Sequence, residues 1–310
     1  MKIGVIGLGL IGGSMAKALS AYTAHAVFGS DTNAQVLTQA LADGAIGGIL
    51  DDTACAACDV LLVALYPGTA IRAVSERAGH IRKGALVVDC CGTKGGVCAA
   101  LEPLAKEKGF CFIGGHPMAG REKFGYDASN AELFRGASMI LTPCEDVPVQ
   151  DLARAQALFY ELGFGRMCIC TPAEHDRMIA YTSQLAHVVS SAYVQSPASL
   201  SHVGFSAGSF QDMTRVARLY EPMWTELFLN NAEPLAMEID GLVERLQAFS
   251  DAIRRVRSTH EDFRANCRRK TKERPCDTQF QPRARGARSC DGPGRGRHGT
   301  LCEAAVSNHV

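Results

Sequence analysis

The chain has 310 residues, of which 47% are hydrophobic and 21% are charged. This is ordinary globular usage, and the length accommodates about two domains, so collagen, coiled-coil rods and wholly disordered chains are excluded. Basic and acidic residues both number 32, and the resulting net charge of zero excludes a strongly basic nucleic-acid-binding protein.

The first half of the chain alternates strand-like and helix-like segments. Strands are predicted at 2–6, 26–30, 60–64, 85–89, 110–114 and 138–142, and helices at 13–21, 33–43, 69–79 and 95–108. Apolar strands that alternate with helices indicate a mostly parallel sheet covered on both faces. We therefore predict a doubly wound, Rossmann-type α/β domain over residues 1–165.

A second, all-helical domain for substrate binding and dimerisation is predicted over residues 166–258. After a helix at 150–162 and a short strand at 166–170, the pattern is helical. Thr171, Pro172 and Glu174 suit the N-cap, N1 and N3 positions of a helix that runs to about residue 195.

The last helix carries an apolar seam whose members are spaced alternately by four and three residues: Leu235, Ile239, Leu242, Leu246, Phe249, Ile253 and Val256. Such a seam packs either within its own domain or against a second copy of the chain. We expect a homodimer, because the helical region is too small to cover so long a seam.

Residues 259–310 have a different composition, with 11 basic and 6 acidic residues and no hydrophobic period. We predict that this basic tail is disordered. RNA binding is disfavoured because the tail lacks interleaved aromatic residues. An alternative is that the tail is an out-of-frame or read-through product, and its removal should then leave folding and activity intact.

The sequence predicts no membrane-spanning segment, no signal peptide and no metal site. No run approaches the roughly 20 apolar residues that a spanning helix requires. Strand-like residues begin at Ile3, so we expect no signal peptide, a cytoplasmic location and reduced thiols for the 13 cysteines. The pair Cys55 and Cys58 lacks the further ligands of a zinc site, so no metal is predicted.

The segment Gly7-Leu-Gly9-Leu-Ile-Gly12 follows the first strand and opens a helix, as in dinucleotide-binding proteins. Gly7 suits a tight turn, Gly9 a close approach to a diphosphate, and Gly12 close packing of helix on strand. Asp31, 19 residues after Gly12, is expected to bind ribose hydroxyls and repel a 2′-phosphate, which favours NAD over NADP. Other residues expected beside the cofactor are Leu8, Leu10, Ile11 and Leu65.

Three further segments follow predicted strands, at 65–67, 89–94 and 114–123, and ligands of such sheets bind at that edge. His116 lies in the third, where Gly115, Pro117 and Gly120 indicate a position fixed by the backbone. Hydride removal from an alcohol-bearing carbon needs a group that takes the hydroxyl proton, and a neutral histidine has a suitable pKa. His116 is therefore the candidate catalytic residue.

Four motifs together resemble prephenate dehydrogenases, over roughly residues 1–257. They are the glycine loop, the segment Asp89 to Lys94, the run Gly-Gly-His-Pro-Met-Ala-Gly that contains His116, and the segment Asp212-Met-Thr-Arg215 followed by Trp224. The resemblance implies NAD-dependent oxidative decarboxylation of prephenate to 4-hydroxyphenylpyruvate, in tyrosine biosynthesis.

The resemblance also implies roles for individual residues. His116 would polarise the 4-hydroxyl group, Arg215 would bind a substrate carboxylate, and Glu122 would help to gate or orient the site. Lys94 and Lys123 would add positive charge for a dianionic substrate, and His187 matches a histidine of the family's helical Ser-His-Leu-Pro-His motif.

Two positions depart from the family pattern. Gln184 stands where the helical motif has its first histidine, and it is expected to bind substrate or the cofactor amide. Gly92 stands where many members have serine, so Thr93 or a water would supply the hydroxyl. Alternative functions are arogenate dehydrogenase, a β-hydroxyacid dehydrogenase, and a non-catalytic NAD-binding regulator.

Overall fold

The computed structural model describes residues 1–120 and 123–255. The predicted tail at 259–310, Val256 of the apolar seam and the candidate residue Glu122 therefore lie outside the described residues. The chain divides into two compact units after residue 247, and every contact discussed below lies within the first unit.

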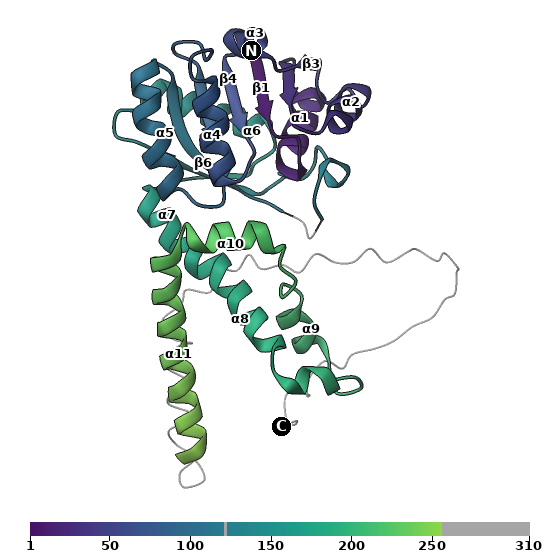
Figure 1. The fold of residues 1–310 in the computed structure, drawn as a ribbon, viewed down its shortest axis with the longest axis vertical. Helices are drawn as coiled ribbons and strands as arrows, with labels where there is room; N and C mark the ends of the chain where they lie inside the picture. The colour runs from purple at the N-terminus through teal and green to yellow at the C-terminus, as the bar shows by residue number, and fades with distance from the viewer. Residues whose placement is uncertain (121–122, 256–310) are drawn as a thin grey trace, which may run out of the picture. The chain divides into compact units, whose positions relative to one another are not determined.

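The described strands form an eight-stranded sheet in the order β3-β2-β1-β4-β5-β6-β7-β8. Their bounds are β1 (Lys2–Ile6), β2 (Ala26–Ser30), β3 (Gly48–Ile49), β4 (Val60–Val63), β5 (Leu86–Asp89), β6 (Cys111–Met118), β7 (Ser138–Pro143) and β8 (Arg166–Ile169). Neighbours are parallel except β6 and β7. The strand order reverses between β1 and β4, which lie side by side in Figure 1, and this switch point is where such sheets bind ligands.

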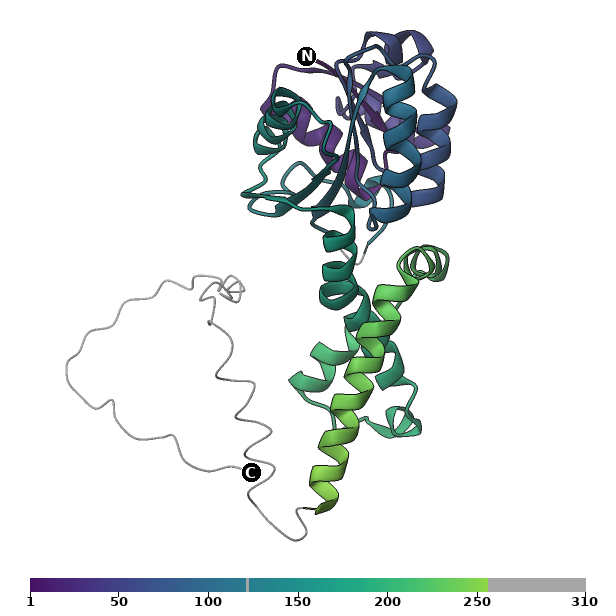
Figure 2. The same cartoon turned by 90° about the vertical axis from the view of Figure 1, so that its left-hand side faces the viewer.

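Helices cover both faces of the sheet, as the alternating pattern predicted (Figure 2). They are α1 (Leu10–Tyr22), α2 (Ala34–Ala42), α3 (Asp52–Ala57), α4 (Pro67–Arg77), α5 (Gly95–Lys108) and α6 (Val149–Glu161). Met15 of α1 and Leu158 of α6 are buried in the core of one face, and Val74 of α4 and Leu101 of α5 in the core of the other. Each such side chain contributes about 1.5–3 kcal/mol, and the predicted doubly wound domain is confirmed.

The chain after the sheet is helical, as predicted. The elements are α7 (Pro172–Ile179), a π-helical turn (Ala180–Gln184), α8 (Leu185–Val194), α9 (Gly208–Thr214), α10 (Glu221–Leu229) and α11 (Ala232–Arg255). Short 3-10 turns lie at Tyr126–Ala128 and Pro197–Ser201. The predicted capping of α7 is present, because Thr171 Oγ1 accepts from the Glu174 N–H at 3.2 Å and Glu174 Oε2 from the Thr171 N–H at 2.9 Å.

Four elements differ from the sequence-based expectation. The short elements β3 and α3 were not predicted, since two strand residues and an Ala/Cys-rich turn carry no period. Strand β6 extends to Met118, so His116 lies inside a strand and pairs with Ile140 of β7. Strand β8 belongs to the sheet, which therefore continues past the domain boundary predicted after residue 165.

The seam on α11 is covered only at its beginning. Leu235 is buried, and Ile239 and Leu242 pack on the same small core, which includes Leu185. Leu246 is 56% exposed. The described part of this helix thus begins in a core and continues with apolar side chains on the surface. Among the described residues, no helix is long and apolar enough to cross a membrane.

Candidate active site

The glycine loop between β1 and α1 has the geometry that each predicted role requires. Gly7 has a φ of +86°, which side-chain-bearing residues rarely adopt. A Cβ atom at Gly12 would lie 1.8 Å from the Gly7 carbonyl oxygen, whereas one at Gly9 would meet nothing within 4 Å. The loop is thus closed on the protein side at Gly12 and open at Gly9.

Residues around this loop fit a dinucleotide. Gly9, the N-cap of α1, supplies no side-chain cap, so no capping side chain competes with an anion for the first N–H groups of the helix, near Leu10 and Ile11. Asp31 follows β2, and its two carboxylate oxygens accept the N–H groups of Leu8 at 2.8 Å and Asn33 at 2.9 Å. Each oxygen keeps a lone pair for a ribose hydroxyl.

Leu65 packs against the glycine loop. Its side chain would lie 2.6 Å from a Cβ atom at Gly7, so it directly contacts the turn at this glycine. It follows β4, the strand next to β1. Leu65 therefore lies beside the glycine loop, where its predicted contact with the cofactor requires it.

His116 is held by an unusually close strand packing. A Cβ atom at Gly115 would lie 2.5 Å from the Asp89 carbonyl oxygen, and one at Gly114 would lie 2.2 Å from Thr142 Oγ1. Both positions therefore require glycine, and the pair lets β6 lie tightly between β5 and β7. This explains the Gly-Gly that precedes the histidine.

A buried ion pair fixes the peptide next to His116. Asp89 and Lys94 are both fully buried and paired with each other. The Lys94 ammonium also donates to the Gly115 carbonyl at 2.6 Å, and Asp89 accepts the Gly115 N–H at 3.1 Å. Burial, the largest single effect, lowers the pKa of Lys94, but the Asp89 carboxylate and the neighbouring thiols of Cys91 and Cys98 together raise it by more, so the lysine stays charged.

This arrangement bears on the predicted role of Lys94. Its side chain is completely buried and its ammonium is already bound, so the structure gives it no direct contact with a substrate. Its charge still acts inside the site, since it contributes to the lowered pKa of His116. The sequence could not show this, because the burial of Lys94 follows from tertiary packing.

His116 is hydrogen-bonded to a series of polar side chains that the sequence did not predict. His116 Nδ1 lies 2.9 Å from His175 Nε2, and His175 Nδ1 lies 2.7 Å from Asp176 Oδ1. His175 is 1% exposed. Burial, the neighbouring His175 and the charge of Lys94 hold the pKa of His116 well below its ordinary value, so the ring is neutral near pH 7.

Asp176 also caps helix α5. Its Oδ1 accepts the Lys94 N–H at 2.8 Å and its Oδ2 accepts the Gly95 N–H at 2.7 Å. Burial raises the pKa of Asp176, but the hydrogen bonds from His175 and from these two N–H groups lower it by more, and the carboxylate form is favoured. The one signal in the sequence was a His-Asp pair in the first turn of a well-capped helix.

Gln184 is bound inside the protein. Its Nε2 donates to the Leu227 carbonyl at 2.9 Å, and its Oε1 accepts from Asn231 Nδ2 at 2.7 Å. Asn231 Nδ2 also donates to the Asp176 carbonyl at 2.8 Å. Gln184 ends the π-helical turn and is 1% exposed, so its amide joins helices and does not fit the predicted contact with substrate or cofactor.

A second cluster forms on the helices. His187 Nδ1 donates to the Val216 carbonyl at 2.9 Å, and its ring centroid lies 3.9 Å from that of Trp224. Burial lowers the pKa of His187, the Val216 bond raises it, and the charge of Arg215 lowers it again. Arg215 itself is exposed at the end of α9. The structure therefore brings His187, Arg215 and Trp224 together.

The remaining predicted residues lie in the two loops beside these clusters. Thr93 is 1% exposed. At Gly92, a Cβ atom would lie 3.0 Å from the side chain of Leu227, which fills the space that a serine there would need. Lys123 is exposed, and the ring of its neighbour Phe124 lies 5.5 Å from the ring of Tyr220, just before α10.

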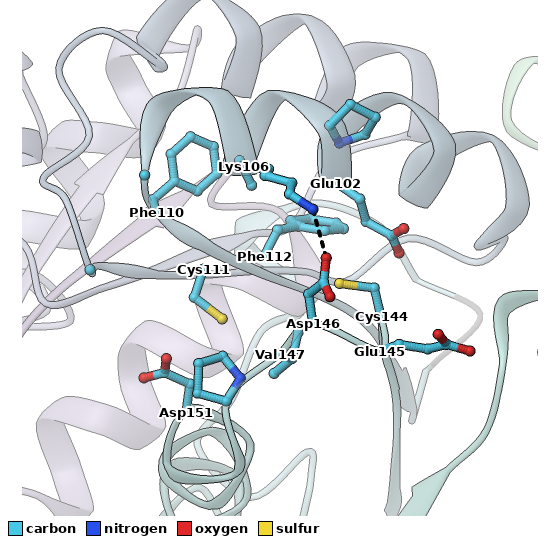
Figure 3. A pocket seen from close by; sticks show the side chains of 15 residues that line it. Glu102, Lys106, Phe110, Cys111, Phe112, Cys144, Glu145, Asp146, Val147 and Asp151 are labelled. Atoms are coloured by element: carbon cyan, nitrogen blue, oxygen red, sulfur yellow. Dashed lines mark hydrogen bonds and ion pairs between the residues drawn. The ribbon is translucent and has the colours of Figure 1, made fainter.

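A cavity of roughly 650 Å³ lies elsewhere, between α5 and the segment after β7 (Figure 3). Its lining includes Phe112, Cys144 and the ion pair of Lys106 with Asp146, at 2.8 Å. None of the predicted site residues that the structure describes lines it. Its charged lining is mostly acidic, and the candidate active site is therefore the glycine loop with His116.

Two family descriptions cover most of the chain. Residues 15–168 match the nucleotide-binding domain of prephenate dehydrogenase, and residues 171–268 match its dimerization domain. A cyclohexadienyl dehydrogenase of Zymomonas mobilis is 32% identical over 260 residues, which is 81% of this chain and 88% of that protein. The chain belongs to the prephenate dehydrogenase family. The family predicted from the motifs is thus confirmed, as is the predicted class of NAD-dependent oxidoreductase.

Other prephenate dehydrogenase family members agree in sequence and fold. A prephenate dehydrogenase of Lactococcus lactis is 28% identical over 80% of this chain and 70% of its own length. The crystal structure of Synechocystis arogenate dehydrogenase has a TM-score of 0.75 at 25% identity and covers 87% of this chain and 98% of that one. A prephenate dehydrogenase of Aquifex aeolicus, solved with hydroxyphenyl propionate and NAD+, has a TM-score of 0.72 at 27% identity and covers 87% and 95%.

Proposed function

We propose that the chain catalyses the NAD-dependent oxidative decarboxylation of prephenate to 4-hydroxyphenylpyruvate, a step of tyrosine biosynthesis. The observation that carries this proposal is the position of the half-buried His116 on β6, 2.9 Å from the buried His175, where burial lowers its pKa and favours the neutral ring. The relatives named prephenate dehydrogenase support the choice of substrate. Bound NAD supplies the acceptor for the hydride that leaves the substrate ring.

His116 takes the proton of the substrate 4-hydroxyl group in this proposal. A neutral imidazole has a free lone pair, and its lowered pKa keeps that lone pair available at physiological pH. As hydride leaves, the hydroxyl becomes a ketone carbonyl and its proton passes to His116. Loss of the ring carboxylate as CO2 then leaves its electron pair in the ring, which restores aromaticity and makes the reaction strongly downhill. The phenolate oxygen formed in this way takes the proton back from His116.

The helical cluster is proposed to bind the substrate's carboxylates. Arg215 is an exposed residue, and a guanidinium suits a carboxylate in a two-point geometry. His187 and Trp224 lie next to each other and offer a polar and an aromatic surface. Lys123, exposed in its loop, adds positive charge, and the predicted roles of Glu122 and Thr93 stand beside these as proposals.

NAD is proposed to be preferred over NADP. Asp31 places a carboxylate at the end of β2, where the adenosine ribose of a bound dinucleotide is expected. A 2′-phosphate there would meet this negative charge, while ribose hydroxyls would donate to it. The relative of Aquifex aeolicus was solved with NAD+.

Arogenate is the second candidate substrate. The support is the similarity to the arogenate dehydrogenase of Synechocystis, because the match covers 98% of that protein at a TM-score of 0.75. Arogenate differs from prephenate in carrying an amino-acid side chain in place of a keto acid. Both would present the same ring hydroxyl to His116, so the difference would be read by the helical cluster.

We further propose a cytoplasmic homodimer. The match to a dimerization domain and the exposed Leu246 on α11 support an interface between two copies along this helix. Analytical ultracentrifugation should give twice the mass of the chain. Leu246→Glu should shift this mass toward the monomer, and an unchanged dimer would contradict an interface at this position.

The deciding experiment is an assay of NADH or NADPH formation by the purified chain. It compares prephenate with arogenate, and NAD with NADP, in parallel. We expect prephenate with NAD to give the highest kcat/KM. Faster turnover of arogenate would replace the substrate assignment, and turnover of neither compound would overturn the proposed function.

A further inference from the structure

We propose that His175 and Asp176 are positioning residues that fix the tautomer of His116, so that His116 Nε2 carries the lone pair that takes the substrate proton. The link to catalysis rests on the proposed function. The tautomer itself is a property of the protein alone and can be measured without a substrate.

The direction of the hydrogen bonds begins at Asp176. Both of its carboxylate oxygens accept backbone N–H groups, from Lys94 at 2.8 Å and Gly95 at 2.7 Å, and a backbone N–H can only donate. An ionised carboxylate has only acceptor sites. The contact of 2.7 Å between Asp176 Oδ1 and His175 Nδ1 therefore requires a hydrogen on His175 Nδ1.

The next contact follows from the chemistry of imidazole. A neutral ring that donates from one nitrogen accepts at the other, so His175 Nε2 carries a lone pair. His116 Nδ1 lies 2.9 Å from it and must donate. An imidazolium at His175 would reverse this contact and leave the ring hydrogen of His116 on Nε2, and the measurement described below distinguishes the two arrangements.

The result at His116 is a bare Nε2. Its Nδ1 carries the ring hydrogen, so Nε2 is the acceptor. Histidine side chains in water favour the opposite tautomer, with the hydrogen on Nε2, which could not take a proton from a hydroxyl at that atom. The contact with His175 thus selects the tautomer that the proposed reaction needs.

Both ends of the hydrogen-bonded series from Asp176 through His175 to His116 are held by further contacts. The Asp89–Lys94 ion pair holds the Gly115 peptide immediately before His116. On the other side, Asn231 Nδ2 donates to the Asp176 carbonyl at 2.8 Å. Groups whose neighbours are fixed by packing and hydrogen bonds keep a catalytic side chain within the narrow range of useful geometries.

Position 92, in the loop after β5, has no side chain that could orient His116 in place of His175. Gly92 has no side chain, and Leu227 lies 3.0 Å from where its Cβ atom would be. A serine hydroxyl at this place therefore plays no part in orienting His116. In this chain the orientation of His116 comes from α7 through His175.

Two variants of His175 separate positioning from packing. His175→Asn keeps a donor near the Nδ1 position for Asp176 but is too short to reach His116. His175→Gln places an amide oxygen near the Nε2 position, where it can accept from His116 Nδ1. The two side chains are both neutral amides, so they form a matched pair.

The measurement is the ¹⁵N shift of the ring nitrogens in the full chain labelled at its 9 histidines, with His116 assigned by its loss in His116→Asn. We expect His116 to be protonated at Nδ1 in the wild type and in His175→Gln, and mainly at Nε2 in His175→Asn. With substrate, kcat should fall on the order of 10²-fold in His175→Asn and only a few-fold in His175→Gln, with little change in KM.

Three results would overturn the proposal. They are a hydrogen on His116 Nε2 in the wild type, an unchanged His116 tautomer in His175→Asn, and equal losses of kcat in both variants alongside equal losses of thermal stability. If the tautomer shifts as expected while the wild type turns over neither prephenate nor arogenate, the positioning role stands and the proposed function fails.

Discussion

The His116 centre and the cluster of Arg215, His187 and Trp224 handle polar groups in opposite ways. In the first, the partners His175, Asp176 and Lys94 are buried and joined by hydrogen bonds. In the second, Arg215 is exposed at a helix end. A buried network fixes geometry, whereas an exposed side chain at a helix end can be reached by a ligand. We therefore expect changes in the first to lower kcat and changes in the second to raise KM.

The largest expected effect is at His116. His116→Asn removes the proton acceptor but keeps a polar group, so kcat should fall about 10²–10⁴-fold while KM stays within a few-fold. Steady-state kinetics with NAD and the preferred substrate measure both values, and the melting temperature checks that the variant is folded. A near-native kcat would remove His116 from the mechanism.

Breaking the ion pair beneath this centre should reduce stability. Lys94→Met leaves the buried Asp89 carboxylate unpaired, which should lower the free energy of unfolding by about 3–5 kcal/mol in urea titrations. The double variant Asp89→Asn with Lys94→Met leaves no buried charge and should recover part of the loss. If Lys94→Met were as stable as the wild type, the pair would not hold β6 in place.

Arg215 tests the other side of the comparison. Arg215→Ala removes a charged hydrogen bond to substrate, which contributes about 1.5–3 kcal/mol, so KM should rise roughly 10–100-fold. Arg215→Lys keeps the charge without the two-point geometry, so its KM should lie between those of the wild type and Arg215→Ala. A loss of kcat at unchanged KM would show that Arg215 acts on the chemical step.

The smallest expected effect is at the cap of α7, the helix that carries His175. Thr171→Ala removes a capping hydroxyl and should lower the free energy of unfolding by about 0.5–2 kcal/mol, with kcat unchanged. Thr171→Ser keeps the hydroxyl and serves as the control. If kcat fell as well, the cap would also help to position His175.

The features predicted from the sequence are those encoded by repeating patterns or by residues close together in the chain. Apolar strands alternating with helices were enough for the doubly wound sheet, and the glycine loop and His116 lie in short contiguous motifs. The capping of α7 was also visible, because Thr171 and Glu174 are three residues apart. These features depend on neighbours along the chain.

What the sequence could not predict depends on residues far apart. His116 and His175 are separated by 59 positions, and no local pattern joins them. The burial of Lys94 against Asp89 was also invisible, so its charge was assigned to the substrate. Gln184 was assigned a ligand for the same reason, although its partners are Leu227 and Asn231.

The central claim is that His116 works as a neutral acceptor, and the pH dependence of kcat/KM tests it most directly. Protonation of His116 would abolish its lone pair, so activity is lost as the pH falls through its pKa. Because burial, His175 and Lys94 lower that pKa, the acid limb of the profile should lie below the ordinary histidine value of about 6.5. His187→Asn should leave this limb in place. A limb at or above 6.5, or none in acid, would contradict the account.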